Sequence, residues 1–529
     1  MTTDRPIPSD APTSIGRPID LDELTLADVR AGALRGRPVT VLGFARSGIA
    51  LARFFADTGA RVTIYDGRPA SELADAVAAL DGRPVRLLVG PDVAPGTALA
   101  GAALVATSPS INPDFPTTEP RLRNALRSLV DARAAGDPAA PALVSEADLF
   151  LRLCPAPTIG VTGTKGKTTT SSLIAAVLAA DPSHPVVLGG NIGVPLVERL
   201  VDLTADHRVV IELSELQLPT LSRGTTVAVY TNVTSDHLDR HGSLEGYRRA
   251  KRRLAELVDP AGALVLNADD PVVAAYADAG RARIIRYGLD RSQPGDVGVV
   301  DDWIVASDVG RLPLSGGGVA AAGPDGRVMP IAELSIPGRH NVSNALAAVA
   351  TGLLFGIDAD AIRGAAAAFT GVEHRLEFVA RRDGVAFVND SQGTQPDAVV
   401  AALRAYDPPI VLIAGGRDKG VDLSDLASVV AERASAAVLI GESGPQLERL
   451  FRGAGLALTR RAAGMDEAVR TAYGLARERL AAGEEAPAVV LLSPAAASFD
   501  MFVDYAARGA AFKDAVGRLV DEPLEEKDA

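Results

Sequence analysis

A glycine-rich loop that ends in lysine and threonine is the strongest chemical signal in the sequence. It lies between an apolar run typical of a strand and an Ala/Leu pattern typical of a helix. In such a loop, successive backbone N–H groups surround phosphates, Lys167 adds positive charge and the Thr168 hydroxyl can reach Mg²⁺. Val161 stands where the strict motif has its first glycine, but the order of strand, loop and helix still predicts a phosphate site. The loop residues are Gly163, Thr164, Lys165, Gly166, Lys167, Thr168 and Thr169.

A single carboxylate, Glu212, stands in the apolar run from Val209 to Leu218. An unpaired carboxylate buried in such a strand would cost several kcal/mol, so a cation partner is expected. Mg²⁺ is the natural partner beside a phosphate loop, because it prefers one or two carboxylates together with phosphate and water oxygens. The alternative is that Glu212 lies at the strand end and contacts solvent. The phosphate loop upstream favours the metal.

The segment from Thr231 to Lys251 contains a second group of candidates. Asp236, His237 and Asp239 follow a predicted strand, where α/β sheets place ligand contacts. His237 could therefore bind a metal or orient a carboxylate. Lys251 lies in a run of basic residues, and from pattern alone this run is more typical of a solvated helix face than of a catalytic site.

Polar residues further along the chain stand at the ends of predicted elements. Asn341 and Asn344 are one turn apart at a helix start, where they could hydrogen-bond to the edge of a base. Helix capping is the competing interpretation. Arg375 and Lys419 would suit anionic ligands. His374 has no metal-ligand spacing with another histidine, so it is expected to orient a neighbour or to donate a hydrogen bond.

Nearer the N-terminus, residues from Pro38 to Asp66 predict a strand, a turn, a helix and a second strand. The helix N-terminus could hold an anion, and Asp66 closes the second strand. The turn sequence is GFARSG rather than GxGxxG, so NAD binding is not expected. The unit can hold another nucleotide, and the alternative is a turn without a ligand.

The composition is that of a globular protein of a reducing cytoplasm. The chain has 529 residues, of which 47% are hydrophobic and 22% charged, and its net charge is −13. This length predicts two to four domains. The single cysteine, Cys154, excludes a disulfide framework, and neither a spanning apolar run nor a secretion signal is evident. The acidic charge argues against a nucleic-acid partner, and no membrane insertion is expected.

Alternating strand and helix patterns predict an α/β protein with three domains. The last part contains four candidates for buried strands: VAFVND, PIVLIAGG, AAVLIG and PAVVLLS. The Gly-rich interval from Leu312 to Gly326 predicts loops and short hairpin strands. The expected parts are a flexible extension of residues 1–36, a Rossmann-like domain of residues 37–153, a central P-loop ATPase-like domain of residues 154–370 and a C-terminal Rossmann-like domain of residues 371–529.

In their order and spacing, these motifs resemble those of the Mur ligase family, and in particular its glutamate-adding branch. The segments that carry the resemblance are GTKGKTT, GGNIG, IELSELQL, NVTSDHLDRH, YRRAK, GRHNVSNALAA, EHRLE, GGRDKG and LSPAAASFDMF. The resemblance implies domains that bind the UDP part of the substrate, ATP, and the incoming amino acid. It implies a cytoplasmic monomer that joins glutamate to UDP-N-acetylmuramoyl-L-alanine through an acyl phosphate during peptidoglycan precursor synthesis.

The resemblance also assigns roles to individual residues. Lys167 would act on the ATP phosphates, and Thr168 and Glu212 would bind one Mg²⁺ ion. His237 and a carbamylated Lys251 would bind a second, because carbamylation turns a repelling ammonium into an anionic oxygen ligand. Uridine contacts are implied for Ser47, Asp66, Arg68 and Ser108, a muramoyl contact for Asn191, an adenine contact for Asn344, a phosphate contact for Arg375, and contacts in the glutamate site for Thr394, Lys419, Ser498 and Phe499.

Three segments depart from the family pattern. Gln392 replaces the lysine of DSKATN, the sequence SELQL from Ser214 replaces SSFQL, and SPSI from Ser108 replaces SPGI. Loss of the lysine removes a charge near the amino-acid and ATP site. The sequence therefore leaves both D- and L-glutamate open as the amino acid added.

Three other functions are possible from the sequence. The nearest is a different ligase of the same superfamily, such as a folylpolyglutamate synthase. The second is a P-loop NTPase without ligase activity, which would not account for the motifs of the last domain. The third is a non-catalytic nucleotide-binding protein. The intact set of candidate catalytic residues argues against it: Lys167, Thr168, Glu212, His237 and Lys251.

Overall fold

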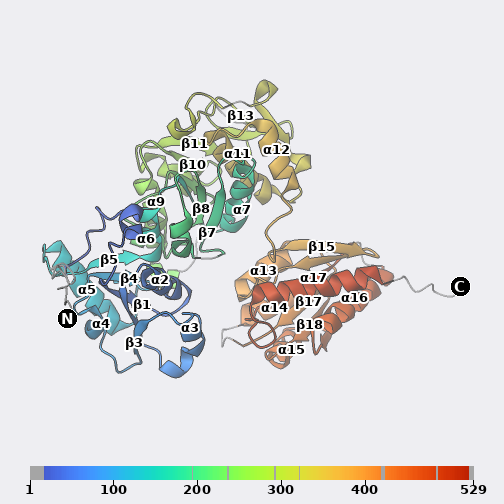
Figure 1. Ribbon diagram of the computed structural model, residues 1–529. Helices are drawn as coiled ribbons and strands as arrows, with labels where there is room; N and C mark the ends of the chain where they lie inside the picture. Colours follow the sequence, from blue (N-terminus) through green and yellow to red (C-terminus); the bar gives the residue numbers. More distant parts are fainter. Residues whose placement is uncertain are drawn as a thin grey trace, which may run out of the picture. The chain divides into compact units, whose positions relative to one another are not determined.

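The structure is a computed structural model that describes residues 17–193, 195–234, 238–290, 294–320, 322–336, 338–418, 423–483 and 487–522. The chain divides into two compact units, Met1–Phe369 and Thr370–Ala529. The first unit contains two sheets and the second contains one (Figure 1). This confirms the predicted α/β class with three sheets, while the domain bounds stay predictions. Among the described residues, no helix is long and apolar enough to cross a lipid bilayer.

The first sheet has five parallel strands in the order β3-β2-β1-β4-β5. The order reverses between β1 and β4, and ligands of such sheets bind outside the carboxyl ends of the strands at that point. The strands are β1 (Pro38–Leu42), β2 (Arg61–Asp66), β3 (Val85–Val89), β4 (Leu104–Thr107) and β5 (Ala142–Ser145). The helices are α2 (Arg46–Asp57), α3 (Ala74–Ala78), α4 (Pro95–Leu99), α5 (Pro120–Ala134) and α6 (Glu146–Leu153).

Residues 17–36 are part of this folded domain. They include the short helix α1 (Leu26–Arg30), and Leu34 is fully buried in the core of the first unit. The backbone N–H of Ile19 donates to the carbonyl of Ala103 at 2.9 Å. The expectation of a flexible extension up to residue 36 is therefore corrected for residues 17–36. Their apolar residues alternate with charged and polar ones in short stretches, and packing against the first sheet reveals their place in the core.

Replacing Leu34 by alanine is expected to lower the free energy of unfolding by about 2–4 kcal/mol. The reason is that the substitution removes the favourable transfer free energy of the buried side chain and leaves a cavity in the core. Denaturant unfolding of the full chain measures the change. Glu23→Ala, at an exposed position of the same segment, is the control and is expected to change stability little. An unchanged unfolding energy for Leu34→Ala would contradict the packing of this segment.

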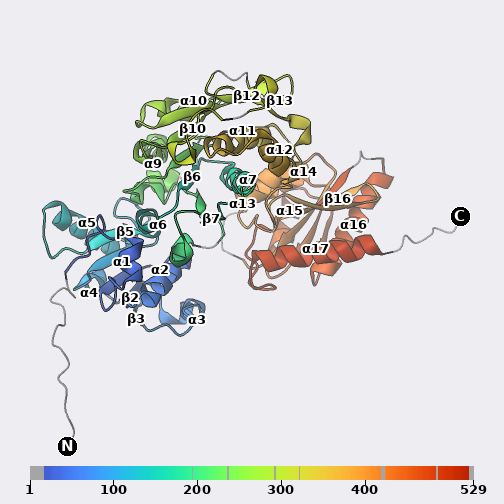
Figure 2. The ribbon, with the colours of Figure 1, turned by 45° about the horizontal axis from the view of Figure 1, so that its top comes forward.

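The second sheet has nine strands in the order β14-β13-β12-β11-β10-β9-β6-β8-β7. Strands β6 to β12 pair in parallel, whereas β12, β13 and β14 pair antiparallel. Figure 2 shows α7 and α11 side by side against this sheet. The strands are β6 (Thr158–Thr162), β7 (Val186–Gly190), β8 (Arg208–Glu212), β9 (Val227–Tyr230), β10 (Ala263–Asn267), β11 (Arg283–Tyr287), β12 (Val297–Val300), β13 (Trp303–Ala306) and β14 (Arg327–Pro330). The helices are α7 (Lys167–Leu178), α8 (Leu238–His241), α9 (Leu244–Leu257), α10 (Pro271–Ala274), α11 (Arg339–Leu354) and α12 (Ala359–Ala368).

The third sheet has six strands in the order β15-β16-β20-β17-β18-β19. Along β17, Leu412 packs into one apolar core, while Val411 and Ile413 pack into the other, because alternate side chains face opposite sides of a sheet. The four predicted buried strands are confirmed as β16 (Val385–Asn389), β17 (Ile410–Gly415), β18 (Ala436–Ile440) and β20 (Ala488–Leu492). The other elements are β15 (Glu377–Arg382), β19 (Thr459–Arg461), α13 (Pro396–Arg404), α14 (Ser424–Arg433), α15 (Gly444–Gly453), α16 (Met465–Ala481) and α17 (Tyr505–Asp521).

Candidate active site

The glycine-rich loop connects β6 to α7, as the sequence predicts. Gly163 and Gly166 have φ angles of 153° and 83°, in the region that favours glycine. A Cβ atom on Gly163 would lie 1.9 Å from Oγ1 of Thr231. Only glycine fits at position 163 on this path of the backbone. The path directs the loop around the start of α7, where its N–H groups can surround a phosphate.

The segment that follows β9 holds the loop in place. The carbonyl of Asn232 accepts a hydrogen bond from the N–H of Thr164 at 2.7 Å, and its side-chain Oδ1 accepts from the N–H of Lys165 at 2.9 Å. Oγ1 of Thr231 donates to the carbonyl of Lys165 at 2.6 Å. The loop is therefore held in its conformation by the protein itself, which reduces the entropy lost on binding a phosphate.

Two lysines converge on the carbonyl oxygen of Gly163. Nζ of Lys167 donates to it at 3.0 Å, and Nζ of Lys251 donates to it at 2.9 Å. Lys251 is 0% exposed, and it lies on α9 in line with the buried residues Tyr247 and Leu254. The solvated-face interpretation of the basic run is thus wrong for Lys251. The lysine occupies the apolar stripe of the helix, about one turn after Tyr247 and one turn before Leu254.

Glu212 is the last residue of β8 and lies beside Val161 of β6, directly before the loop. Its side chain is 1% exposed, so the solvent-facing alternative is wrong. Oε1 accepts a hydrogen bond from Nδ2 of Asn191 at 2.8 Å. Oε2 is buried and has no hydrogen-bond partner among the described residues. A buried carboxylate oxygen without a hydrogen-bond donor is suited to bind a cation, because leaving it unpaired costs free energy.

The predicted metal ligands are only partly described by the structure. Thr168 is buried in the first turn of α7. His237 lies outside the described residues. Within the part of the chain that the structure describes, no group of three or more His, Cys, Asp or Glu side chains could hold a metal ion. A metal at this site would therefore depend on Glu212, the Thr168 hydroxyl and phosphate oxygens.

Asn344 lies inside α11 and contacts the phosphate loop. Its Oδ1 accepts a hydrogen bond from Oγ1 of Thr170 at 3.0 Å, and its Nδ2 donates to Oδ1 of Asn341 at 3.1 Å. A Cβ atom on Gly166 would lie 2.9 Å from the Asn344 oxygen. The capping interpretation is wrong for both asparagines, because the N-cap residue of α11 is Gly338.

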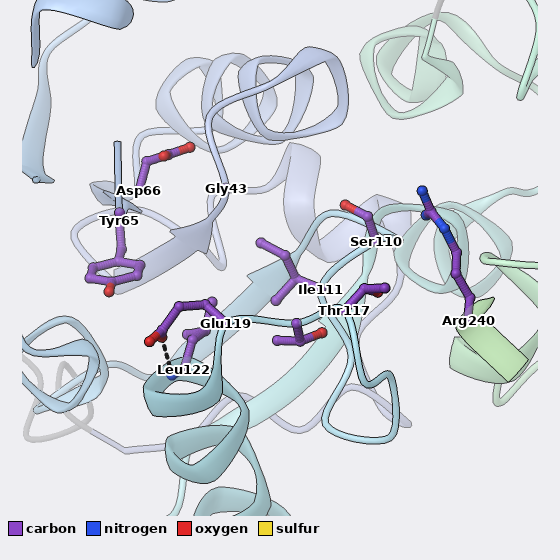
Figure 3. Close-up of a pocket in the computed structure, with 11 residues that line it drawn as sticks. Gly43, Tyr65, Asp66, Ser110, Ile111, Thr117, Glu119, Leu122 and Arg240 are labelled. Carbon is purple, nitrogen blue, oxygen red and sulfur yellow. Dashed lines mark hydrogen bonds between the residues drawn. The ribbon is translucent and has the colours of Figure 1, made fainter. Parts of the chain in front are cut away.

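A first pocket of about 310 Å³ lies at the carboxyl ends of β1 and β2 and includes Asp66 (Figure 3). Figure 3 shows Tyr65 and Asp66 on one side of it and Ser110 and Thr117 on the other. Nε and Nη2 of Arg68 donate to the Asp66 carboxylate at 3.0 and 2.9 Å. Burial alone would raise the pKa of Asp66, but the Arg68 side chain and backbone N–H donors outweigh it and lower the pKa.

A second pocket, of about 180 Å³, lies next to the first, and Ser110 lines both. It brings together Ser47 of α2 and Ser108, directly after β4, with Asn191 from the loop after β7. These three residues are predicted from the sequence to bind parts of one substrate, and the structure places them around one cavity. Glu146, at the start of α6, also lines it and was not singled out by any sequence motif.

In the second unit, the loops after β16 and β20 carry Thr394 and Ser498. Arg508 of α17 is 1% exposed and joins these loops. Its Nη2 donates to the carbonyl of Ser391 at 2.9 Å, and its Nη1 donates to the carbonyl of Ala496 at 3.1 Å. Sequence reasoning did not identify Arg508. The signal that could have found it is its position four residues before Phe512, which places both side chains on the buried face of α17.

The other predicted residues of this unit, and Asp390 beside them, have different surroundings. His374 is buried, with Nδ1 at 3.0 Å from Nδ2 of Asn389, in agreement with a hydrogen-bonding role. Burial raises the pKa of Asp390 to about 6, although Ser493 and Arg375 oppose the rise. Phe499 is 64% exposed. Lys419 lies outside the described residues.

Comparisons with known proteins agree with these features. A model of the Mur ligase middle domain matches residues 161–352, and a model of the Mur ligase glutamate ligase domain matches residues 374–496. The UDP-N-acetylmuramoylalanine–D-glutamate ligase of Symbiobacterium thermophilum is 39% identical over 92% of this chain and 100% of its own length. That of Pelotomaculum thermopropionicum is 38% identical over 91% of this chain and 97% of its own length.

A solved structure shares the fold. The UDP-N-acetylmuramate–alanine ligase of Thermotoga maritima aligns with a TM-score of 0.50 at 19% identity. The alignment covers 91% of this chain and 99% of the Thermotoga chain. At this identity the similarity supports the fold alone.

Proposed function

The chain belongs to the Mur ligase family, and on that premise we propose that it joins D-glutamate to UDP-N-acetylmuramoyl-L-alanine in a reaction driven by ATP. The observation that supports this most directly is the convergence of Lys167 and Lys251 on the phosphate loop, with Glu212 on the neighbouring strand. D-glutamate is favoured over L-glutamate because the relatives from Symbiobacterium thermophilum and Pelotomaculum thermopropionicum are named D-glutamate ligases.

The proposed reaction has two steps. The alanine carboxylate of the acceptor attacks the γ-phosphorus of ATP, and ADP leaves, which gives an acyl phosphate. The amine of glutamate then attacks the acyl carbon, phosphate leaves, and the new amide loses a proton. Lys167 and the loop N–H groups stabilise the charge on the transferring phosphoryl group. Bound Mg²⁺ would neutralise further charge on the phosphate oxygens.

Two metal positions are part of the proposal. Thr168 and Glu212 would hold one ion, and the orphaned Oε2 of Glu212 supports this assignment. His237 and a carbamylated Lys251 would hold a second. Carbamylation joins the neutral Lys251 amine to CO₂ and releases a proton, and its product would offer an anionic oxygen ligand to a second Mg²⁺ ion. The complete burial of Lys251 supports this step.

Substrate contacts are proposed from the two pockets and the second unit. The uridine end of the acceptor would lie near Asp66, Arg68, Ser47 and Ser108, and its muramoyl part near Asn191. The other proposed contacts are Asn344 with adenine, Arg375 with phosphate, and Thr394, Lys419, Ser498 and Phe499 with glutamate. The proposal includes a cytoplasmic monomer with domains at residues 37–153, 154–370 and 371–529.

Phosphate release tests the proposed function. Full-length protein is mixed with ATP, Mg²⁺ and UDP-N-acetylmuramoyl-L-alanine, and D-glutamate, L-glutamate or another amino acid is added separately. The expected result is phosphate release that requires the acceptor and D-glutamate. Release that requires L-glutamate would correct the stereochemistry, and release that depends on none of the amino acids would overturn the ligase assignment.

A further inference from the structure

Glu146 is a buried carboxyl group that the proposed reaction does not use. It is 4% exposed, at the first position of α6, and it lines the same cavity as Ser47, Ser108 and Asn191. The other lining residues offer hydroxyl, amide and guanidinium groups, so Glu146 is the one acidic side chain among the described residues around this cavity.

The charged groups that face Glu146 come from two elements. Arg46 of α2 lowers the pKa of Glu146, and Glu198 of the 3₁₀ helix Leu196–Asp202 raises it. The backbone N–H of Val197 also donates to Glu146 and favours its ionised form. On its own helix, Asp148 is engaged by Arg152 and Ser222.

Burial outweighs these stabilising contacts. Desolvation raises the pKa of Glu146 to about 7, despite the Val197 donor and Arg46. The start of α6 would also favour a negative charge, but this effect is small beside the loss of hydration. At neutral pH the protonated and ionised forms of Glu146 are therefore about equally populated. A ligand charge nearby can shift this equilibrium toward one form.

The acceptor would supply such charge. UDP-N-acetylmuramoyl-L-alanine carries a diphosphate diester and a carboxylate, so it is a polyanion at neutral pH. Arg46, which donates to the carbonyl of Gly193 and lines the cavity, is the group that an anion there would engage. A bound anion near Glu146 then disfavours a second negative charge in the same low-dielectric space.

We infer that Glu146 binds the acceptor as a neutral carboxylic acid and donates a hydrogen bond to an oxygen atom of its sugar–peptide part. This inference rests on the proposed function. It makes Glu146 a specificity residue, because a protonated carboxyl provides a donor that an ionised one cannot. It also implies that acceptor binding takes up a proton from solution.

Because acceptor binding takes up a proton, the affinity for the acceptor is expected to fall as the pH rises. Below about pH 7 Glu146 already carries the proton, so binding is at full strength. Above about pH 7 the proton must be taken up, and affinity falls by up to about tenfold per pH unit. The acceptor itself has no group that titrates there, since an α-carboxyl has a pKa of about 3.5.

Isothermal titration calorimetry with UDP-N-acetylmuramoyl-L-alanine alone tests the inference. For the wild-type protein, Kd is expected to rise about tenfold between about pH 6 and pH 8. At about pH 7, the binding enthalpy should differ between phosphate and Tris buffers by an amount that corresponds to uptake of about half a proton. This second measurement needs no variant.

Glu146→Gln keeps a donor and stays neutral, so its Kd is expected to be independent of pH and buffer. Glu198→Gln is the matched control. It should keep the pH dependence, with the midpoint at slightly lower pH, because Glu198 raises the pKa of Glu146. If the wild-type protein binds the acceptor equally well at both pH values without proton uptake, the inference about Glu146 fails while the proposed function stands. If it binds no acceptor at either pH, the proposed function fails as well.

Discussion

Replacing Lys251 by alanine is expected to reduce kcat for phosphate release by about 10³-fold, and short-chain carboxylates such as acetate should restore part of it. The magnitude is that of losing one major electrostatic contact to a transferring phosphoryl group. Restoration is expected because the shortened side chain leaves a buried space beside Gly163, where an added carboxylate can supply the oxygen atoms of the proposed carbamate.

Two controls separate this role from a structural one. Arg249→Ala removes an exposed cation from the same helix and is expected to leave activity unchanged. If Lys251 served only to hold the carbonyl of Gly163, its removal would weaken ATP binding, and added carboxylate would have no effect. Full activity of Lys251→Ala would exclude any role in the reaction.

The parts of the fold that could be predicted are those with local signals. The loop from Gly163 to Thr169 was evident because glycine, lysine and threonine stand between an apolar run and a helical pattern. The strands β16, β17, β18 and β20 were evident because both faces of each are covered, which gives continuous apolar runs. Neither signal depends on distant parts of the chain.

The edge strands of the third sheet lack such a signal. β15 is an antiparallel edge strand with partly exposed side chains, and β19 has three residues, two of which are exposed arginines. In the interval from Leu312 to Gly326, the described residues form 3₁₀ turns and an isolated bridge rather than the expected hairpin strands. The conformation of short or exposed elements depends more on contacts with neighbouring elements than on their own sequence.

The burial of two charged residues, Lys251 and Glu146, was not predicted from the sequence. Lys251 and Arg249 stand in one basic run, and only the orientation of α9 buries one and exposes the other. Glu146 lies in the unremarkable segment LVSEADLF, and its environment comes from α2 and the 3₁₀ helix that contains Glu198. Residues whose chemistry depends on tertiary burial need the structure before they can be identified.

Replacing Glu212 by glutamine is expected to lower activity by about 10³-fold and to raise the Mg²⁺ concentration needed for half-maximal activity by about tenfold or more. A neutral amide is a much weaker ligand for a hard cation than a carboxylate. The variant keeps the side-chain shape, and its amide oxygen can still accept the hydrogen bond from Asn191. The measurement is phosphate release over a range of Mg²⁺ concentrations.

The thermal stability of the same variant distinguishes a metal ligand from a structural carboxylate. Without metal, Oε2 of Glu212 is a buried acceptor with no donor among the described residues, so loss of its charge should leave Tm unchanged or raise it. Glu245→Gln, at an exposed position of α9, is the control for both measurements and is expected to behave like the wild type. A Tm lowered by several degrees, together with an unchanged Mg²⁺ requirement, would contradict the metal-ligand role. Lower activity with an undiminished Tm is the result expected of a carboxylate that is kept for its ligand rather than for the fold.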